Sequence, residues 1–210
     1  MYNLQKQHYS ILQGDNIKIK IKKLASVQMG YSFRSRLEPS EGGGVAVIQM
    51  KDLLDDNTVW CNDLIKIDMN GVKEHHLAQR GDLIFRSRGL LTTSAILLKY
   101  PGKTVVSAPL IRIRVTRLDM VLPEYLNWYI SQRDAQIFLT SRAKGTAAQM
   151  IDKQVIENLE ITLPDLEKQK NIVELAVLSA REQKLLNTLS NKRKQYIESV
   201  LAQIAKGERK

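Results

Sequence analysis

Hydrophobic and polar positions alternate along the first part of the chain in short runs typical of β-strands. Ile17, Ile19 and Ile21 alternate with lysines, and this period of two predicts a strand with one buried and one basic face. Further β-prone runs follow, separated by turn signals such as Asn70-Gly71. They cover residues 45–49, 64–67, 82–86, 95–98, 104–106 and 110–115. Because no regular helices separate them, they predict a curled mixed or antiparallel sheet.

Helical spacing replaces the strand pattern after Pro123, which stands where a helix could begin. Apolar side chains recur at helical spacing from Tyr125 to Phe138, and a shorter helix could start at Asp152. Residues 159–163 resemble one last strand. The pattern therefore predicts an α+β globular domain in which a few helices accompany the sheet.

The sequence beyond Pro164 predicts one long helix. Asp165 is a suitable N-cap, and no proline or glycine interrupts the chain from there to Lys206. At 1.5 Å per residue, about 40 residues would form a helix of roughly 60 Å. Apolar side chains follow one face near the helical period: Ile172, Leu175, Leu178, Leu185, Leu189, Tyr196, Val200 and Ile204.

This apolar stripe needs a partner, because the preceding domain is too small to cover a helix of that length. A second helix, expected from another chain, would cover the stripe in a coiled coil. Glu182 and Arg193 fall within the stripe. They either set the register of such a pair or simply make the stripe imperfect. The predicted organisation is thus a domain over residues 1–164 and a spacer and dimerisation helix over residues 165–210.

Composition and charge narrow the class of partner. Hydrophobic residues make up 43% and charged residues 26% of the chain, which is ordinary for a folded globular protein. The net charge of +10 and the isoelectric point near 9.7 favour a polyanionic partner, either nucleic acid or an anionic membrane surface. The sequence contains no run of about 18 apolar residues, so it predicts no membrane span. Its first residues lack the apolar core of a signal peptide. We therefore expect a cytoplasmic protein without a membrane partner.

Motifs for catalysis and for metal binding are absent from the sequence. Cys61 is the only cysteine, which excludes a disulfide framework and a cysteine zinc site. His75 and His76 are adjacent, and neighbouring side chains point apart, so they are poor joint metal ligands. Residues 102–104 lack the earlier glycine of a phosphate-binding loop. The cofactor turn and the Asn/Asp-Pro-Pro-aromatic loop of an amino-methyltransferase are also missing, so we expect no catalytic residue, metal or bound cofactor.

Several segments, taken in order, carry a resemblance to a known family. Residues 23–30 end in glycine, residues 77–89 contain a Gly-Asp-hydrophobic strand, and residues 123–126 contain a Tyr-Leu element. A glycine loop at residues 145–151 precedes a strand ending Leu-Pro, an acidic-Gln turn and the long helix, at residues 159–172. In this order and spacing, the chain resembles one repeat of the specificity subunit of type I restriction–modification systems.

The resemblance implies a non-catalytic subunit that recognises double-stranded DNA through loops inserted into the major groove. Separate adenine-N6 DNA methyltransferase subunits would bind S-adenosylmethionine and supply the chemistry, and a restriction subunit could join them. Members of the family usually carry two recognition domains and two long helices, whereas this sequence shows one of each. It therefore resembles a half-subunit, and a homodimer would read a bipartite site.

Polar and basic residues in predicted loops are the candidates for contacting DNA. Arginine can bind guanine, and glutamine adenine, through two hydrogen bonds, while the others would hold phosphates. Arg86 and Arg88 are the leading candidates, because they follow an apolar strand that would aim them rigidly. The full set is Arg34, Ser35, Arg36, Arg86, Ser87, Arg88, Lys103, Arg142, Lys144, Thr146 and Gln149.

Two other functions stay open from the sequence. A stand-alone DNA-binding regulator would bind its site tightly without any methyltransferase. A structural coiled-coil assembly protein would show no salt-dependent DNA binding, whereas phosphate contacts make affinity fall steeply with salt.

Overall fold

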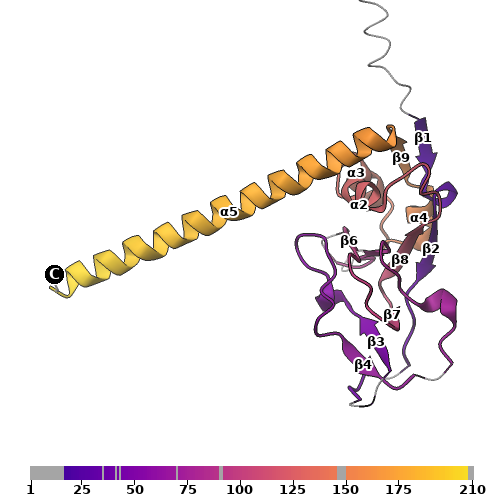
Figure 1. Ribbon diagram of the computed structural model, residues 1–210, viewed down its shortest axis with the longest axis horizontal. Coiled ribbons are helices and arrows are strands. Elements are labelled where there is room, and N and C mark those ends of the chain that lie inside the picture. Colours follow the sequence, from indigo (N-terminus) through magenta and orange to yellow (C-terminus); the bar gives the residue numbers. More distant parts are fainter. Residues whose placement is uncertain are drawn as a thin grey trace, which may run out of the picture. The chain divides into compact units, whose positions relative to one another are not determined.

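The chain forms two compact units, a globular one and a helical one. The computed structural model describes residues 17–207 except 35, 41, 43, 70, 90–91 and 146–149. The globular unit extends to Lys170 and the helical unit begins at Asn171. Figure 1 shows the strands and short helices of the first unit and the single long helix that makes up the second. The predicted α+β fold with a long C-terminal helix is confirmed.

The elements follow one another as short strands, short helices, one last strand and the long helix. The strands are β1 (Ile17–Lys20), β2 (Ala25–Met29), β3 (Val45–Ile48), β4 (Ile65–Ile67), β5 (Leu83–Phe85), β6 (Ser94–Ile96), β7 (Thr104–Val106), β8 (Ile111–Val115) and β9 (Glu160–Leu163). The helices are α2 (Pro123–Ile130), α3 (Arg133–Thr140), α4 (Lys153–Asn158) and α5 (Leu166–Ala205), with 3-10 turns η1 (Ile21–Lys23), η2 (Met50–Asp52) and η3 (Glu74–His76). Each predicted β-prone run overlaps one of these strands.

A four-stranded antiparallel sheet forms the centre of the globular unit (Figure 1). Its strand order is β2-β8-β5-β6. All three residues of β5 are fully buried, and successive side chains point to opposite faces, so both faces of this strand are covered. Ile84 of β5 shares a core cluster with Ile48 and Val106, which end β3 and β7. This core therefore joins the central sheet to a second one.

The second sheet has the order β4-β3-β7, with β3 antiparallel to β4 and parallel to β7. Val45, Val47, Ile67 and Val105 form a core cluster of their own on this sheet. The expected single curled sheet is therefore divided into separate small sheets. The local pattern could not show this, because the parallel pairing of β3 with β7 joins segments far apart in the sequence.

A third, two-stranded sheet pairs β1 antiparallel with β9. Ile17 is 58% exposed, so the prediction of a buried apolar face is wrong at the start of β1. Ile21, just beyond the strand, is fully buried, and its backbone N–H donates to Leu159 O at 3.0 Å. This pairing fixes β9, from which the chain passes into α5.

The helical segment predicted from Tyr125 to Phe138 is two helices in the structure. Between α2 and α3, Gln136 Nε2 donates to Ile130 O at 2.6 Å and so satisfies a carbonyl left open where α2 ends. Tyr125 of α2 donates its hydroxyl to Thr162 O of β9 at 2.7 Å. Burial raises the pKa of Tyr125 to about 12. The break allows α2 to pack on the sheet core independently of α3.

The first turn of α5 is fastened to the globular unit. Asp165 Oδ1 accepts a hydrogen bond from the backbone N–H of Lys168 at 2.8 Å, which confirms the predicted N-cap. Gln169 is fully buried, and its Oε1 accepts from Leu122 N at 2.9 Å. Its Nε2 donates to Met120 O and Pro164 O, each at 2.8 Å. The glutamine of the acidic-Gln turn thus holds the strand-to-helix junction.

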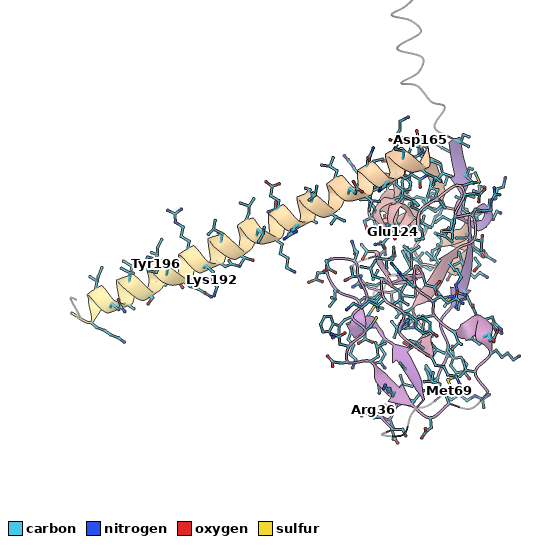
Figure 2. The ribbon with its side chains drawn as sticks, viewed as in Figure 1. Arg36, Met69, Glu124, Asp165, Lys192 and Tyr196 are labelled. Atoms are coloured by element: carbon cyan, nitrogen blue, oxygen red, sulfur yellow. The ribbon has the colours of Figure 1, made fainter. Side chains whose placement is uncertain are left out.

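The helical unit exposes its apolar stripe. Figure 2 shows side chains projecting along this helix, with Lys192 and Tyr196 labelled. No described helix is long and apolar enough to cross a membrane. Ile172 and Val200 are half-buried, whereas the other residues of the predicted stripe are 61% to 71% exposed: Leu175, Leu178, Leu185, Leu189, Tyr196 and Ile204.

A buried carboxylate holds two arginines of the central strand β8. Asp82 is 1% exposed and accepts hydrogen bonds from Arg114 Nε and Nη2, both at 2.7 Å. Arg112 Nε forms a second ion pair with it at 3.8 Å. Both arginines also donate to Leu77 O, at 2.8 and 2.7 Å. The Gly-Asp strand of the sequence motif therefore supplies the counter-charge that allows arginines within a central strand.

The substitution Asp82→Asn should destabilise the globular unit by about 3 kcal/mol, because it leaves two partly buried guanidinium groups without a carboxylate. Urea unfolding of the full chain measures this. Asp119→Asn is the matched control, because Asp119 pairs with Arg117 at 2.7 Å at an exposed site, and it should leave unfolding unchanged. Equal stability of the two variants would contradict the role given to Asp82.

Candidate nucleic-acid interface

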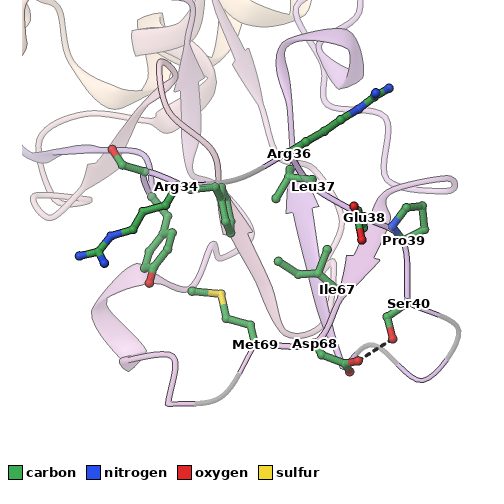
Figure 3. A pocket seen from close by; sticks show the side chains of 12 residues that line it. Arg34, Arg36, Leu37, Glu38, Pro39, Ser40, Ile67, Asp68 and Met69 are labelled. Atoms are coloured by element: carbon green, nitrogen blue, oxygen red, sulfur yellow. Dashed lines mark hydrogen bonds between the residues drawn. The ribbon is translucent and has the colours of Figure 1, made fainter.

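The loop from Tyr31 to Ser40 is held at both ends by the three-stranded sheet. Tyr31 N donates to Val106 O of β7 at 2.6 Å. Ser40 N donates to Lys66 O of β4 at 3.0 Å, and Ser40 Oγ donates to Asp68 Oδ2 at 2.6 Å (Figure 3). The loop therefore presents its side chains from a fixed frame.

A cavity of about 730 Å³ opens between this loop and the end of β4. Its lining includes the apolar side chains of Phe33, Leu37 and Met69, which pack against the core of the three-stranded sheet. Arg34 and Arg36 are exposed, and Figure 3 shows their side chains extending away from each other on opposite sides of it. The cavity thus has an apolar floor and a polar border that includes Glu38 and Asp68 as well as the two arginines.

Lys103 lies at the same edge of the three-stranded sheet as the end of this loop. β3 and β7 run parallel and β4 antiparallel, so the starts of β3 and β7 meet the end of β4 at one edge. Lys103 immediately precedes β7, and its carbonyl accepts from Ala46 N at 2.9 Å. The exposed Lys103 side chain therefore adds a cation to the edge at which Ser40 and Asp68 are joined.

A second group of cations forms where the chain after β5 meets the glycine loop. Arg88 and Lys144 both form β-bridges with Met150. Ile151 N donates to Ser87 O at 2.8 Å, which aligns the two segments. Arg88 is exposed, while Lys144 Nζ forms an ion pair with Asp152 at 2.6 Å. Two candidates that are far apart in the sequence are therefore brought together.

Arg142 lies on the approach to this glycine loop. Its guanidinium stacks 3.8 Å over the ring of Phe138 and donates to Phe138 O at 3.2 Å. The side chain remains exposed, so it presents an oriented positive charge. Three other candidates, Ser35, Thr146 and Gln149, lie outside the described residues.

The expectation that Arg86 and Ser87 project from the surface is wrong. Arg86 is only 8% exposed, and its Nη2 donates to Leu53 O at 2.7 Å. Its Nη1 donates to Thr93 Oγ1 at 3.0 Å, and burial lowers the pKa of the guanidinium. Ser87 is fully buried and donates to Pro109 O. Both side chains satisfy backbone carbonyls inside the fold, which leaves Arg88 as the exposed member of this group.

A polar network beneath the loop was not found from the sequence. Arg112 Nη2 donates to Gln28 Oε1 at 2.6 Å, and Gln28 Nε2 lies 3.0 Å from His76 Nδ1. The ring of His76 meets that of Tyr31 edge-on, with centroids 5.5 Å apart. Burial, aided by nearby positive charges including His75, lowers the pKa of His76. The only signal for this network was the alternation of arginines with isoleucines in β8.

The network connects the Asp82 ion pairs to the start of the loop. Within the described ranges, no three histidine, cysteine, aspartate or glutamate side chains gather closely enough to hold a metal ion. The arrangement positions exposed cations beside a cavity with a polar border.

Comparison with known families accounts for this arrangement. Residues 14–199 match the family described as type I restriction modification DNA specificity domain. The chain belongs to this family. The predicted resemblance is confirmed, and so is the assignment of the specificity domain to a recognition class instead of a catalytic one. A curated relative is the type I restriction enzyme MjaVIII specificity subunit of Methanocaldococcus jannaschii, 26% identical over 95 residues, which are 45% of this chain and 18% of that protein.

Solved structures share the fold of this specificity domain. A chain from a structure titled as the basis of complex assembly and conformational transition of the type I R-M system matches with a TM-score of 0.65 at 16% identity, covering 95% of this chain and 50% of that one. The HsdS subunit of Thermoanaerobacter tengcongensis matches with a TM-score of 0.56 at 19% identity, covering 87% and 45%. The present chain therefore spans about half the length of these structures.

Gly30 controls the entry to the Tyr31–Ser40 loop. A Cβ atom at this position would lie 2.6 Å from the backbone C and O of Ser107, so Gly30→Ala should destabilise the fold by roughly 1–3 kcal/mol. Thermal unfolding measures the loss. Gly44→Ala is the matched control, because nothing lies within 4 Å of its added Cβ. A wild-type melting temperature for Gly30→Ala would show that the close approach to Ser107 does not constrain the loop.

Proposed function

We propose that this chain is the DNA-recognition subunit of a type I restriction–modification system. It selects the site at which a separate adenine-N6 DNA methyltransferase acts. The family assignment and the net charge of +10 support this function. The exposed loop cations contact double-stranded DNA, and the long helix sets the spacing of a bipartite site.

The main observation that supports the proposal is a set of exposed arginines without ion-pair partners on loops that are anchored by hydrogen bonds. Arg34, Arg36 and Arg88 are exposed, and none has an ion-pair partner among the described residues. By contrast, Arg112 and Arg114 are committed to Asp82 in the interior. Uncompensated cations on a rigid scaffold are available to phosphates and base edges, where arginine binds guanine O6 and N7 together.

The surroundings of the other three exposed cations suit them to contacts with phosphates. Lys103 is an exposed point charge suited to a phosphate. Lys144 must exchange its ion pair with Asp152 for a phosphate contact, which the competing polyanion favours. The stacked Arg142 is held in a fixed orientation by Phe138. These three position the DNA, while Arg34, Arg36 and Arg88 are better placed to read bases.

The catalytic partner follows from the same assignment. The sequence contains neither a cofactor turn nor a methyltransferase loop, so S-adenosylmethionine binds in the partner methyltransferase subunit. A restriction subunit joins the complex where cleavage accompanies methylation. Two copies of the chain, paired through the exposed stripe of α5, provide two recognition domains for the two halves of the site.

Mapping methylated adenines in cells that express the partner methyltransferase, with and without this chain, tests the proposal. We expect a bipartite motif only when the chain is present, and a symmetric motif if two copies act together. An unchanged methylation pattern would remove the recognition function and leave α5 as an assembly element.

Arg88→Ala should weaken binding to the mapped site by roughly 1–3 kcal/mol if Arg88 reads a base. Binding at two salt concentrations, measured on specific and scrambled duplexes, separates base reading from phosphate contact. Arg117→Ala is the matched control, because this exposed arginine is paired with Asp119, and it should leave affinity unchanged. Unchanged affinity and site preference in Arg88→Ala would exclude Arg88 from the interface.

A further inference from the structure

Glu38 is an exposed carboxylate in the loop from Tyr31 to Ser40, and it borders the cavity beside that loop. The other carboxylate of this border, Asp68, accepts a hydrogen bond from Ser40 Oγ at 2.6 Å. Glu38 has neither a hydrogen bond nor an ion pair within the part of the chain that the structure describes, although Arg36 is only two residues away. Its carboxylate is therefore available to a donor from outside the chain.

The backbone on both sides of Glu38 is held in place. Leu37 packs against the core of the three-stranded sheet. Pro39 has a fixed φ and restricts the residue before it to extended conformations. Ser40 N donates to Lys66 O at 3.0 Å. Figure 3 shows Glu38 between these anchors, so its side chain projects from a defined frame.

Such a carboxylate is unexpected on a surface that contacts phosphates. Arg34 and Arg36, at the border of the same cavity, attract the DNA backbone, whereas Glu38 is repelled by it. A neutral side chain at this position would raise the affinity for any duplex. Glu38 therefore weakens non-specific binding, and it favours binding only where the DNA offers it a hydrogen-bond donor.

Among base edges in the major groove, the edge of cytosine suits a carboxylate best. Its N4 amino group is a donor with no acceptor of the same base beside it, and glutamate accepts a hydrogen bond from it. Adenine presents the acceptor N7 next to its N6 donor, while guanine and thymine present acceptors in place of this donor. These acceptors repel a carboxylate, so the wrong base is penalised and the right base is favoured.

We propose that Glu38 is a specificity-determining residue whose carboxylate accepts a hydrogen bond from the N4 amino group of a cytosine in the recognised site. This rests on the DNA recognition in the proposed function and names one base that the loop selects. Arg36, on the other side of the packed Leu37, is exposed and can bind a neighbouring guanine. The loop thus combines an acceptor and a donor that together favour G·C pairs.

Methylation mapping with variants of the full chain tests this role. Glutamine pairs with adenine N6 and N7, so Glu38→Gln should shift one cytosine position of the motif towards adenine, by about tenfold in relative methylation. Glu38→Ala should leave the same position unspecified while the rest of the motif stays. An unchanged motif in both variants would overturn the proposal.

Glu160→Gln is the matched control, because Glu160 is an exposed carboxylate of β9 in the two-stranded sheet, outside the loop. It makes the same change in net charge as Glu38→Gln and should leave the motif unchanged. A shifted motif in this control would assign the effect to net charge. A uniform rise in the affinity of Glu38→Ala for every duplex, with the motif unchanged, would also overturn the proposal.

Binding to duplexes with a modified cytosine gives an independent readout. N4-methylcytosine at the position identified by mapping still pairs with guanine, but it places a methyl group where the N4 hydrogen would meet Glu38. This replacement should weaken binding by the wild-type chain with its methyltransferase about tenfold, and binding by Glu38→Ala less than about threefold. Fluorescence anisotropy measures the affinities, and thermal unfolding checks that Glu38→Ala is folded. Equal losses in both proteins would exclude the contact.

The outcomes separate this inference from the proposed function. If the wild-type chain directs methylation and both Glu38 variants keep its motif, the role of Glu38 is overturned and the recognition function stands. If the wild-type chain directs no methylation and binds all duplexes alike, the proposed function fails, and the role of Glu38 fails with it.

Discussion

Asp82 and the two arginines of β8 form the interaction on which the globular unit depends. β8 pairs with β2 on one side and β5 on the other, so cations in this strand lie at the centre of the molecule. One buried carboxylate, from Asp82 immediately before β5, pairs with both Arg112 and Arg114, and each arginine also donates a hydrogen bond to Leu77 O. Removing charges from water is costly unless they are paired and hydrogen-bonded. This arrangement pairs both guanidinium groups, although Arg112 Nε, 3.8 Å from Asp82, is buried without a hydrogen-bond partner.

That interaction also fixes the frame of the candidate interface. From Arg112 the network continues through Gln28 and His76 to Tyr31, where the loop with Arg34 and Arg36 begins. A network of partly buried polar groups therefore reaches the residue at which this loop begins. The same residue type serves both purposes, and burial separates the two roles. Arg112 stabilises the sheet, while Arg34 is left for a partner.

The helical unit follows simpler rules than the globular one. A continuous helix turns the sequence into one-dimensional rows, so apolar and charged positions can be assigned to a face without tertiary information. Most of the apolar side chains on this face are exposed in the described chain, and an exposed apolar surface of this kind is typical of an interaction site.

The sequence by itself determined the elements that depend on local chemistry. The Asp165 cap, the length of α5, the strands and the family motifs were all predictable, because capping, periodicity and turns are local properties. Tertiary structure decided what depends on distant contacts. It divided the strands among three sheets, brought Arg88 and Lys144 together at Met150, and buried Arg86 against the Leu53 carbonyl. An arginine after an apolar strand looks the same in sequence whether it meets water or an unpaired carbonyl, and only the folded chain distinguishes them.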